Sequence, residues 1–298
     1  MELRQLRYFQ KACELKNFSE AARALYISQS TLSQQIKQLE DELGILLFDR
    51  IGKRIVPTEA GIAFLPYANK AIADAESGKQ IIRDIKGLES GELNIGATFS
   101  LNAFLLHSLE IFTKKYPKIK VNIMFATSQE LLDKLMDNKL DFVLSFKPEG
   151  ICEESFETVH LFTSRLCAVV HKSHPLAGVS SVSLKKLSEI PLILPERGFA
   201  TRKKIDQLCR KNNNISLKAN IEINDVHTIL HALRKGKWAT ILTKAATKGE
   251  ADLVQIPILC AENLSSKGFL FWRKDRYRKK SAISFSEILI KATGNKQL

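Results

Sequence analysis

Five hydrogen-bonding side chains share one face of a helix that is predicted to begin near residue 29. They are Gln29, Ser30, Ser33, Gln34 and Lys37. The opposite face carries Leu32, Ile36, Leu39 and Leu43, at the four- and three-residue steps of a buried helical stripe. A glutamine amide matches adenine, serine adapts to several bases, and lysine reaches guanine or a phosphate. The polar face therefore predicts a surface that reads the major groove of DNA. An ordinary amphipathic helix with a solvated face is the alternative.

Two flanking elements must position this face. A first helix is expected from Ser19, whose hydroxyl suits the N-cap, and small residues follow it. Ser28 is placed to cap the second helix and Gly44 to end it. After residue 47, Arg54-Ile55-Val56-Pro57 completes a predicted hairpin whose tip holds basic residues. Two short helices and a basic hairpin favour the interpretation that this segment binds DNA, because the hairpin can contact the phosphate backbone.

Composition agrees with a polyanionic partner. The chain has 298 residues, a formal net charge of +13 and a pI of about 9.5, and its length indicates two or three domains. The excess charge is not concentrated at the predicted DNA-reading end, since residues 1–58 hold nine Lys and Arg against seven Asp and Glu, a net of +2. DNA contact must therefore depend on where the basic residues lie and not on the net charge of this segment. A denser basic run at residues 273–280 predicts a solvated segment or, alternatively, a second DNA surface.

The remaining chain separates into a long helix and an α/β region. Thr58 is expected to cap a helix that runs to about Leu88, and Pro66 to kink it. One seam of this helix approximates a coiled-coil repeat and predicts a partner helix: Ile62, Leu65, Ala68, Ile72, Ala75 and Ile82. Gly87, Ser90 and Gly91 indicate a hinge. From residue 92, short apolar strands alternate with helices, which predicts a doubly wound sheet.

Residues 1–61 resemble the winged helix-turn-helix of LysR-type transcriptional regulators. The matching segments are Leu6-Arg7-Tyr8-Phe9, Phe18-Ser19-Glu20-Ala21-Ala22, Ser28-Gln29-Ser30-Thr31-Leu32-Ser33, Leu43-Gly44, Leu47-Phe48-Asp49-Arg50 and Thr58-Glu59-Ala60-Gly61. The resemblance implies DNA contact by the recognition helix and the wing. Together with the polar face, it gives the DNA-binding residues as Gln29, Ser30, Thr31, Ser33, Gln34, Lys37, Lys53 and Arg54. The family often has Pro at position 30 and Arg at position 34, so this chain departs from it at both.

The resemblance also implies the domain organisation. We expect a winged helix-turn-helix over 1–58, a linker and dimerisation helix with its hinge over 59–91, and an effector-binding domain over 92–298. The effector domain of this family is a two-lobed α/β fold of the periplasmic-binding-protein type with a ligand cleft between the lobes. Lobe one is expected over 92–162 and 268–298 and lobe two over 163–267. The chain is then expected to form a homodimer, or a tetramer of paired dimers, on two-fold related half-sites.

A small anion is the expected effector. Three predicted helices begin after Ser100, Ser128 and Thr201, and each combines a hydroxyl with free backbone N–H groups at the positive end of the helix dipole. Arg202 adds a cation, and the alternative is that these hydroxyls only cap helices. The resemblance places the effector pocket at Thr98, Ser100, Ser128, Phe146, Thr201 and Arg202. The segment from Phe199 to Arg202 also resembles the cyanate-operon regulator, which implies a very small anion.

Other chemistries have less support. His227 and His231 have the spacing of a zinc pair on a helix, but no third ligand and no HExxH motif accompany them. The five cysteines are scattered and lack CxxC pairs, and a thiol switch at Cys209 lacks a neighbouring resolving cysteine. Motifs of hydrolases, dinucleotide enzymes and P-loop enzymes are missing. We therefore expect no cofactor and no enzyme. A solute-binding protein without a regulatory role remains the alternative, and the missing signal peptide predicts a cytoplasmic protein.

Overall fold

The computed structural model describes residues 1–51, 54–85, 90–148, 151, 153–212, 215–261 and 263–293. The chain forms two compact units, Met1–Ile85 and Lys86–Leu298. Among the described residues, no helix has the length and apolarity that a membrane crossing requires.

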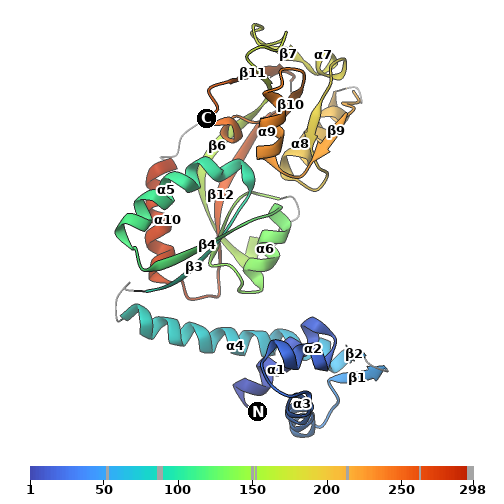
Figure 1. Ribbon diagram of the computed structural model, residues 1–298, viewed down its shortest axis with the longest axis vertical. Helices are drawn as coiled ribbons and strands as arrows, with labels where there is room; N and C mark the ends of the chain where they lie inside the picture. Colours follow the sequence, from blue (N-terminus) through green and yellow to red (C-terminus); the bar gives the residue numbers. More distant parts are fainter. Residues whose placement is uncertain are drawn as a thin grey trace. The chain divides into compact units, whose positions relative to one another are not determined.

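The first unit is a winged helix-turn-helix followed by one long helix (Figure 1). Its elements are α1 (Leu3–Leu15), α2 (Phe18–Ala24), α3 (Gln29–Leu43), β1 (Phe48–Ile51), β2 (Arg54–Pro57) and α4 (Glu59–Ile85). β1 and β2 pair antiparallel, with Phe48 opposite Pro57. The core packs Phe9 against Phe48, with ring centroids 5.4 Å apart, over the buried stripe Leu32, Ile36 and Leu39. The three helices and the hairpin thus share one core.

Two expectations for the helix-turn-helix need correction. The cap of α2 is Asn17, whose side chain accepts from the backbone N–H groups of Ser19 and Glu20, so Ser19 lies inside the helix. Leu43 is 38% exposed and does not join the buried stripe, because it is the last residue of α3 before Gly44 turns the chain. The other two caps are confirmed: Ser28 Oγ accepts from the Thr31 N–H, and Gly44 adopts a left-handed φ of 69°.

The predicted seam of α4 divides into two parts. Leu65, Ala68 and Ile72 pack against the helix-turn-helix core. Ile62 is 64% exposed and Ile82 is 58% exposed, so within this chain they have little cover. Thr58 caps α4 as expected, because its hydroxyl accepts from the Gly61 N–H at 3.0 Å. The predicted end at Leu88 and the hinge residue Gly87 lie outside the described residues.

The second unit is a two-lobed α/β domain, which confirms the predicted fold class. Its strands are β3 (Gly91–Ala97), β4 (Ile119–Phe125), β5 (Phe142–Phe146), β6 (Phe156–His171), β7 (Val182–Ser183), β8 (Ile193–Pro195), β9 (Ile221–Ile223), β10 (Ala239–Thr243), β11 (Leu253–Leu259) and β12 (Ser265–Arg273). Its α-helices are α5 (Asn102–Lys115), α6 (Ser128–Met136), α7 (Leu184–Ser188), α8 (Ala200–Lys211), α9 (Val226–Leu233) and α10 (Lys280–Thr293). The 3-10 helices are η1 (Phe99–Leu101), η2 (Glu153–Ser155) and η3 (Lys244–Thr247).

Two long strands connect the lobes. β6 is one continuous strand of 16 residues. It pairs antiparallel with β12, so that Arg165 lies opposite Ser265 and Phe162 opposite Gly268. One end of β6 joins the β4-β3-β5-β12 part of the sheet, and its other end pairs with β10 and β11. Each lobe is therefore built on the same two strands (Figure 1).

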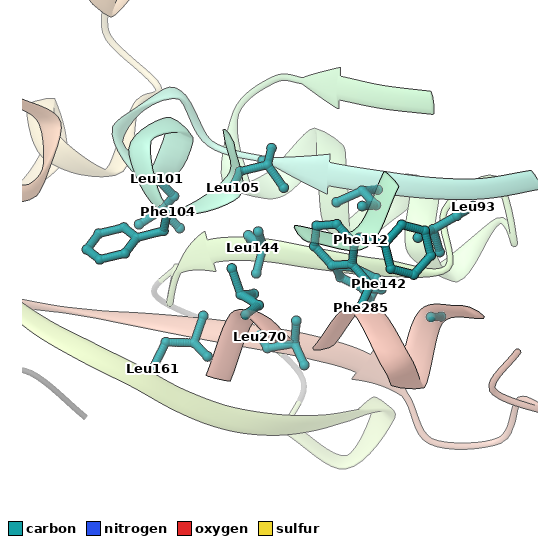
Figure 2. Packing of buried hydrophobic residues seen from close by; sticks show 14 of the residues in the cluster. Leu93, Leu101, Phe104, Leu105, Phe112, Phe142, Leu144, Leu161, Leu270 and Phe285 are labelled. Atoms are coloured by element: carbon teal, nitrogen blue, oxygen red, sulfur yellow. The ribbon is translucent and has the colours of Figure 1, made fainter. Parts of the chain in front are cut away.

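Each lobe has its own apolar core. In lobe one, Figure 2 shows Phe112, Phe142 and Phe285 gathered beside Leu93, and the rings of Phe112 and Phe285 are 5.2 Å apart in an edge-to-face arrangement. Two clusters in lobe two surround the β6, β8 and β10 strands. The separate cores allow the two lobes to act as distinct bodies on either side of a cleft.

The basic run near the C-terminus attaches β12 and the segment before α10 to lobe one. Arg273 Nη1 donates to the Met136 carbonyl at 2.7 Å, and Arg276 Nη1 donates to the Leu140 carbonyl at 2.9 Å. Lys279 Nζ donates to the buried Asp141 carboxylate at 2.9 Å. These side chains therefore have structural partners within the domain, which disfavours a second DNA surface there.

Candidate DNA-binding surface and effector cavities

The polar face of α3 is exposed and locally ordered. The side chains of Gln29, Ser30, Thr31, Gln34 and Lys37 are exposed, and Ser33 is half-buried. Ser28 Oγ lies 2.8 Å from the hydroxyls of both Ser30 and Thr31, and Gln29 Oε1 accepts from Ser19 Oγ at 2.9 Å. The start of α3 thus presents hydroxyl and amide groups in a fixed pattern, as base-edge contacts require.

Tyr26 is a surface feature that the sequence analysis missed. It lies in the turn between α2 and α3, its side chain is 96% exposed, and its φ of 57° is left-handed. A non-glycine residue in this region is uncommon and often marks a functional turn. The only sequence signal is an aromatic residue between two predicted helices. Tyr26 thus gives the turn an exposed aromatic ring with a polar hydroxyl group.

The hairpin is anchored by a buried carboxylate. Glu40 Oε1 accepts from the backbone N–H groups of Leu47 (2.8 Å) and Phe48 (3.2 Å). Glu40 is the one carboxylate on the buried side of α3, and the sequence analysis did not identify its role. Arg54 is exposed on β2, where it can contact a phosphate. Lys53, the other predicted wing residue, lies outside the described residues.

In the second unit, five of the six predicted effector residues line one small cavity between the lobes. It has a volume of about 20 Å³ and is called the small cavity here. Lobe one contributes Thr98, Ser100, Ser128 and Phe146, and Thr201 comes from lobe two. The other lining residues are Phe99, Pro195, Phe199, Ala200, Val226 and Leu242. The lining thus combines four hydroxyl groups with an apolar wall.

Two hydroxyls of the small cavity, those of Thr98 and Ser128, have a hydrogen available to donate. Thr98 is 8% exposed, and its Oγ1 has no hydrogen-bond partner among the described residues. The buried Ser145 Oγ donates to Ser128 Oγ at 2.7 Å, which leaves the Ser128 hydrogen for another acceptor. A buried hydroxyl without a partner costs free energy, so Thr98 in particular favours an occupant with an acceptor oxygen.

Neither Ser128 nor Thr201 is a helix cap, contrary to the alternative prediction. Thr127 caps α6, and its hydroxyl accepts from the Glu130 N–H in a capping box. The backbone N–H and hydroxyl of Thr127 in turn donate to the Glu130 carboxylate, which lowers the pKa of Glu130. The N-cap of α8 is Phe199, which has no side-chain acceptor. The positive end of α8 therefore reaches the small cavity without a neutralising side-chain cap.

Arg202 binds acceptors of the protein in this structure, and its predicted contact with the effector stays a prediction. The guanidinium is 4% exposed and is held by three acceptors: Asp206 Oδ1 at 3.0 Å, the Pro195 carbonyl at 3.0 Å and Glu222 Oε1 at 2.9 Å. Arg202 is not among the lining residues of the small cavity. Its charge is already neutralised by two carboxylates, so it joins α8 to β8 and β9.

A larger cavity adjoins the small one. It has a volume of about 400 Å³, and it shares Ser128, Phe146 and Ala200 with the small cavity. Its cationic lining comprises Lys147, Lys203, Lys204 and Lys267, and we call it the lysine cavity. The sequence analysis did not identify these lysines, because they come from three separate segments.

The remaining candidate groups form no metal centre in the described part of the chain, where no three His, Cys, Asp or Glu side chains are arranged to hold an ion. His227 instead lies 2.9 Å from the Asn102 amide. Burial raises the pKa of the Cys13 and Cys167 thiols to about 12, and it also raises that of Cys209. These thiols stay protonated near neutral pH, which is unfavourable for a redox sensor.

Two family models match almost the whole chain. Residues 3–62 match the bacterial regulatory helix-turn-helix protein of the lysR family, and residues 86–294 match the LysR substrate binding domain. A probable RuBisCO transcriptional regulator from Thalassiosira pseudonana is 31% identical over 269 residues, which cover 88% of this chain and 87% of that protein.

Solved structures support the same fold. A variant of full-length OxyR from Pseudomonas aeruginosa has a TM-score of 0.70 at 22% identity, covering 98% of this chain and 94% of its own. The regulatory domain of CcmR from Synechocystis, solved in complex with 2-PG, has a TM-score of 0.61 at 19% identity and covers 70% of this chain and 100% of its own. The matches to a helix-turn-helix model over residues 3–62 and to a substrate-binding model over residues 86–294 establish that this chain belongs to the LysR family of transcriptional regulators.

Proposed function

We propose that this LysR-type regulator recognises its operator with Gln29, Ser30, Thr31, Ser33, Gln34 and Lys37, while Lys53 and Arg54 contact the phosphate backbone. The observation that carries the DNA part is the ordered, exposed polar start of α3 beside a basic hairpin strand. Access to DNA places the protein in the cytoplasm, and regulation by binding requires no catalysis from it. We keep the boundaries 1–58, 59–91 and 92–298 for the DNA-binding, linker and effector-binding regions.

The effector in this proposal is a small anion held in the small cavity. The observation that carries this part is the Thr98 hydroxyl, which has no partner in the described part of the chain and faces the same cavity as Ser128 and the start of α8. Hydroxyl donors and a helix N-terminus are the usual receptor for a carboxylate or phosphate oxygen. That the related CcmR domain is bound to 2-PG is consistent with a small ligand in this fold. The likeness to the cyanate-operon regulator remains a prediction.

The proposed switch is a shift between lobe arrangements. A ligand that touches Thr98 and Ser128 of lobe one and Thr201 of lobe two stabilises the arrangement in which these groups converge. The change must reach the DNA through a dimer. The exposed apolar residues of α4 offer the surface for a second copy: Ile62, Tyr67, Ile81, Ile82 and Ile85. A dimer then presents two recognition helices to two half-sites.

A salt-resolved gel shift on the DNA upstream of the protein's own gene tests the whole proposal. We expect specific binding that Gln34→Ala weakens and that a small anion alters, with cyanate and 2-PG among the anions tried. Footprinting then separates a regulator from a solute-binding protein, which leaves no protected site. Binding that no anion alters would reject the effector class and retain the DNA role.

Ser128→Ala isolates the effector site. We expect weaker anion binding by calorimetry with an unchanged fold, because Ser145 can still donate to the Phe146 carbonyl at 2.9 Å. Ser108→Ala is the matched control, since it removes a buried hydroxyl from α5, away from both cavities. Equal affinity of the wild type and Ser128→Ala would contradict the assignment.

A further inference from the structure

We propose that the effector is a two-headed anion: one terminal oxygen group enters the small cavity, and a phosphate group is bound in the lysine cavity by Lys147, Lys203, Lys204 and Lys267. This inference rests on the proposed effector function and names the chemical class of its ligand.

The sizes of the two cavities suit a ligand that spans both. A volume of about 20 Å³ accommodates little more than one water-sized group, since about 10–15 Å³ of the same measure holds a water. The lysine cavity has about 400 Å³, which is within the range of small-molecule sites. Ser128, Phe146 and Ala200 line both cavities, so the two are adjacent and one ligand can contact residues of each. A ligand confined to the small cavity would leave the lysines of the lysine cavity without an anion.

The charge of the lysine cavity indicates a group with more than one negative charge. Four lysines line it, and no Asp or Glu of the described ranges does. A phosphate monoester carries about −1.5 to −2 charges at pH 7 and three acceptor oxygens, whereas a carboxylate carries one charge and two. Lysine is a common binder of phosphate as a point charge. The phosphate therefore matches this lining better than a second carboxylate does.

The four lysines come from both lobes and from the strand that joins them. Lys147 follows β5 in lobe one, Lys203 and Lys204 lie in the first turns of α8 in lobe two, and Lys267 lies on β12 opposite Thr163. A phosphate bound among them therefore contacts both lobes and the strand that joins them. The ligand would stabilise that arrangement at two points, the hydroxyls of the small cavity and these lysines.

The half-buried ammonium of Lys204 also favours an anion in the lysine cavity. Its ammonium is half-buried and donates to the carbonyl of Ser265, at the start of β12. Burial lowers the pKa of Lys204, because few solvent molecules remain to stabilise the charge. An anion next to this ammonium stabilises its positive charge in place of the missing solvent. Gln129, Gln207 and Ser266 line the same cavity and can hydrogen-bond to hydroxyl groups between the two ends of the ligand.

The test compares phosphorylated acids with their parent acids by calorimetry on the full-length protein. The probe pairs are 2-phosphoglycolate with glycolate and 3-phosphoglycerate with glycerate. We expect at least one phosphorylated probe to bind about tenfold or more tightly than its parent acid, which corresponds to about 1.4 kcal/mol. Equal affinity within both pairs, or no binding of either phosphorylated probe at millimolar concentration, would overturn the proposal.

Substitutions of the cavity residues test where the phosphate group is bound. The exposed pair Lys203→Gln and Lys267→Gln should reduce the ratio of affinities between the phosphorylated probe and its parent to about one, whereas Ser128→Ala should weaken both members of a pair alike. The control is Lys118→Gln with Lys185→Gln, which removes the same charge from exposed positions outside the cavity. A ratio that survives in the Lys203 and Lys267 variant contradicts the proposal. Binding of parent acids alone, sensitive to Ser128→Ala, would overturn it while leaving the proposed function intact.

Discussion

Nε2 of His227 lies 2.9 Å from Nδ2 of Asn102, and this contact joins the start of α9 in lobe two to the start of α5 in lobe one. Nearby, the Lys248 ammonium of lobe two lies 4.4 Å from the centre of the Phe104 ring of lobe one. The amide of Asn102 can rotate to present its oxygen, so the contact can persist when the imidazole is protonated. We expect these two contacts to bias the lobe arrangement that assembles the small cavity.

Asn102→Ala should therefore weaken effector binding. An exposed hydrogen bond contributes about 0.5–1.5 kcal/mol, so we expect the Kd of the responding anion to rise about two- to tenfold, with the thermal unfolding midpoint nearly unchanged. His231→Ala is the control, since it removes an exposed histidine one turn along the same helix. An unchanged Kd in calorimetry would mean that this contact does not bias the lobes.

Thr98→Val should separate ligand binding from stability. The substitution replaces a buried, unpartnered hydroxyl by a methyl group of similar size, so the free energy of unfolding should stay level or rise by about 1 kcal/mol. The anion should bind more weakly because a donor is lost. Thr240→Val is the matched control: its hydroxyl is also buried and has no partner among the residues that the structure describes, but it lines neither cavity. The same fall in affinity in both variants would refute a direct role for Thr98.

Gly61→Ala should destabilise the DNA-binding unit. A Cβ at position 61 would lie 2.3 Å from the Leu47 carbonyl oxygen, so the backbone that carries the wing must move. Overpacking of this kind costs about 1–3 kcal/mol. Gly78→Ala lies in the same helix with open space around its Cβ, and it should stabilise the unit by up to about 1 kcal/mol. Urea unfolding measures both, and equal effects would show that the close approach at Gly61 carries no energetic cost.

Arg54 and Gln34 should affect DNA binding in different ways. Arg54→Ala should weaken binding to all sequences and reduce the slope of log K against log salt by about 0.9, because one phosphate contact is lost. Gln34→Ala should cost about 1–3 kcal/mol on the operator alone and leave that slope nearly unchanged. Lys211→Ala, an exposed lysine at the end of α8, controls for net charge. Binding assays at several salt concentrations decide between these roles.

The buried thiols of Cys13 and Cys167 should resist alkylation in the native state. Burial raises the pKa of each from 9.0 to about 12, so both are protonated at pH 8. Folding stability is then fully retained below about pH 9 and falls between about pH 9 and pH 12, because the unfolded thiols ionise first. Iodoacetamide labelling read by peptide mass spectrometry should be slow in buffer and fast in urea. Rapid native labelling at pH 8 would contradict the assigned burial.

The sequence by itself determined the DNA-reading head and the alternation of strands and helices. Ser28, Gly44 and Thr58 act on backbone groups within a few residues, and the stripe of Leu32, Ile36 and Leu39 follows from helical periodicity. Such local rules can be read from neighbouring residues alone. These local rules were less reliable at the ends of helices, since they predicted Ser19 as the cap of α2 and the cap is Asn17.

Tertiary structure decided the chemistry of the effector domain. Glu222 and the Pro195 carbonyl, which hold the Arg202 guanidinium, lie on strands outside its own helix, and periodicity contains no information about such partners. The same holds for Glu40, whose role as an acceptor for the Leu47 N–H depends on where the chain returns after α3. The cationic lining of the lysine cavity joins residues 147, 203, 204 and 267. Charge counts along the chain cannot predict that cluster, because only the crossing of β6 and β12 brings the two lobes together.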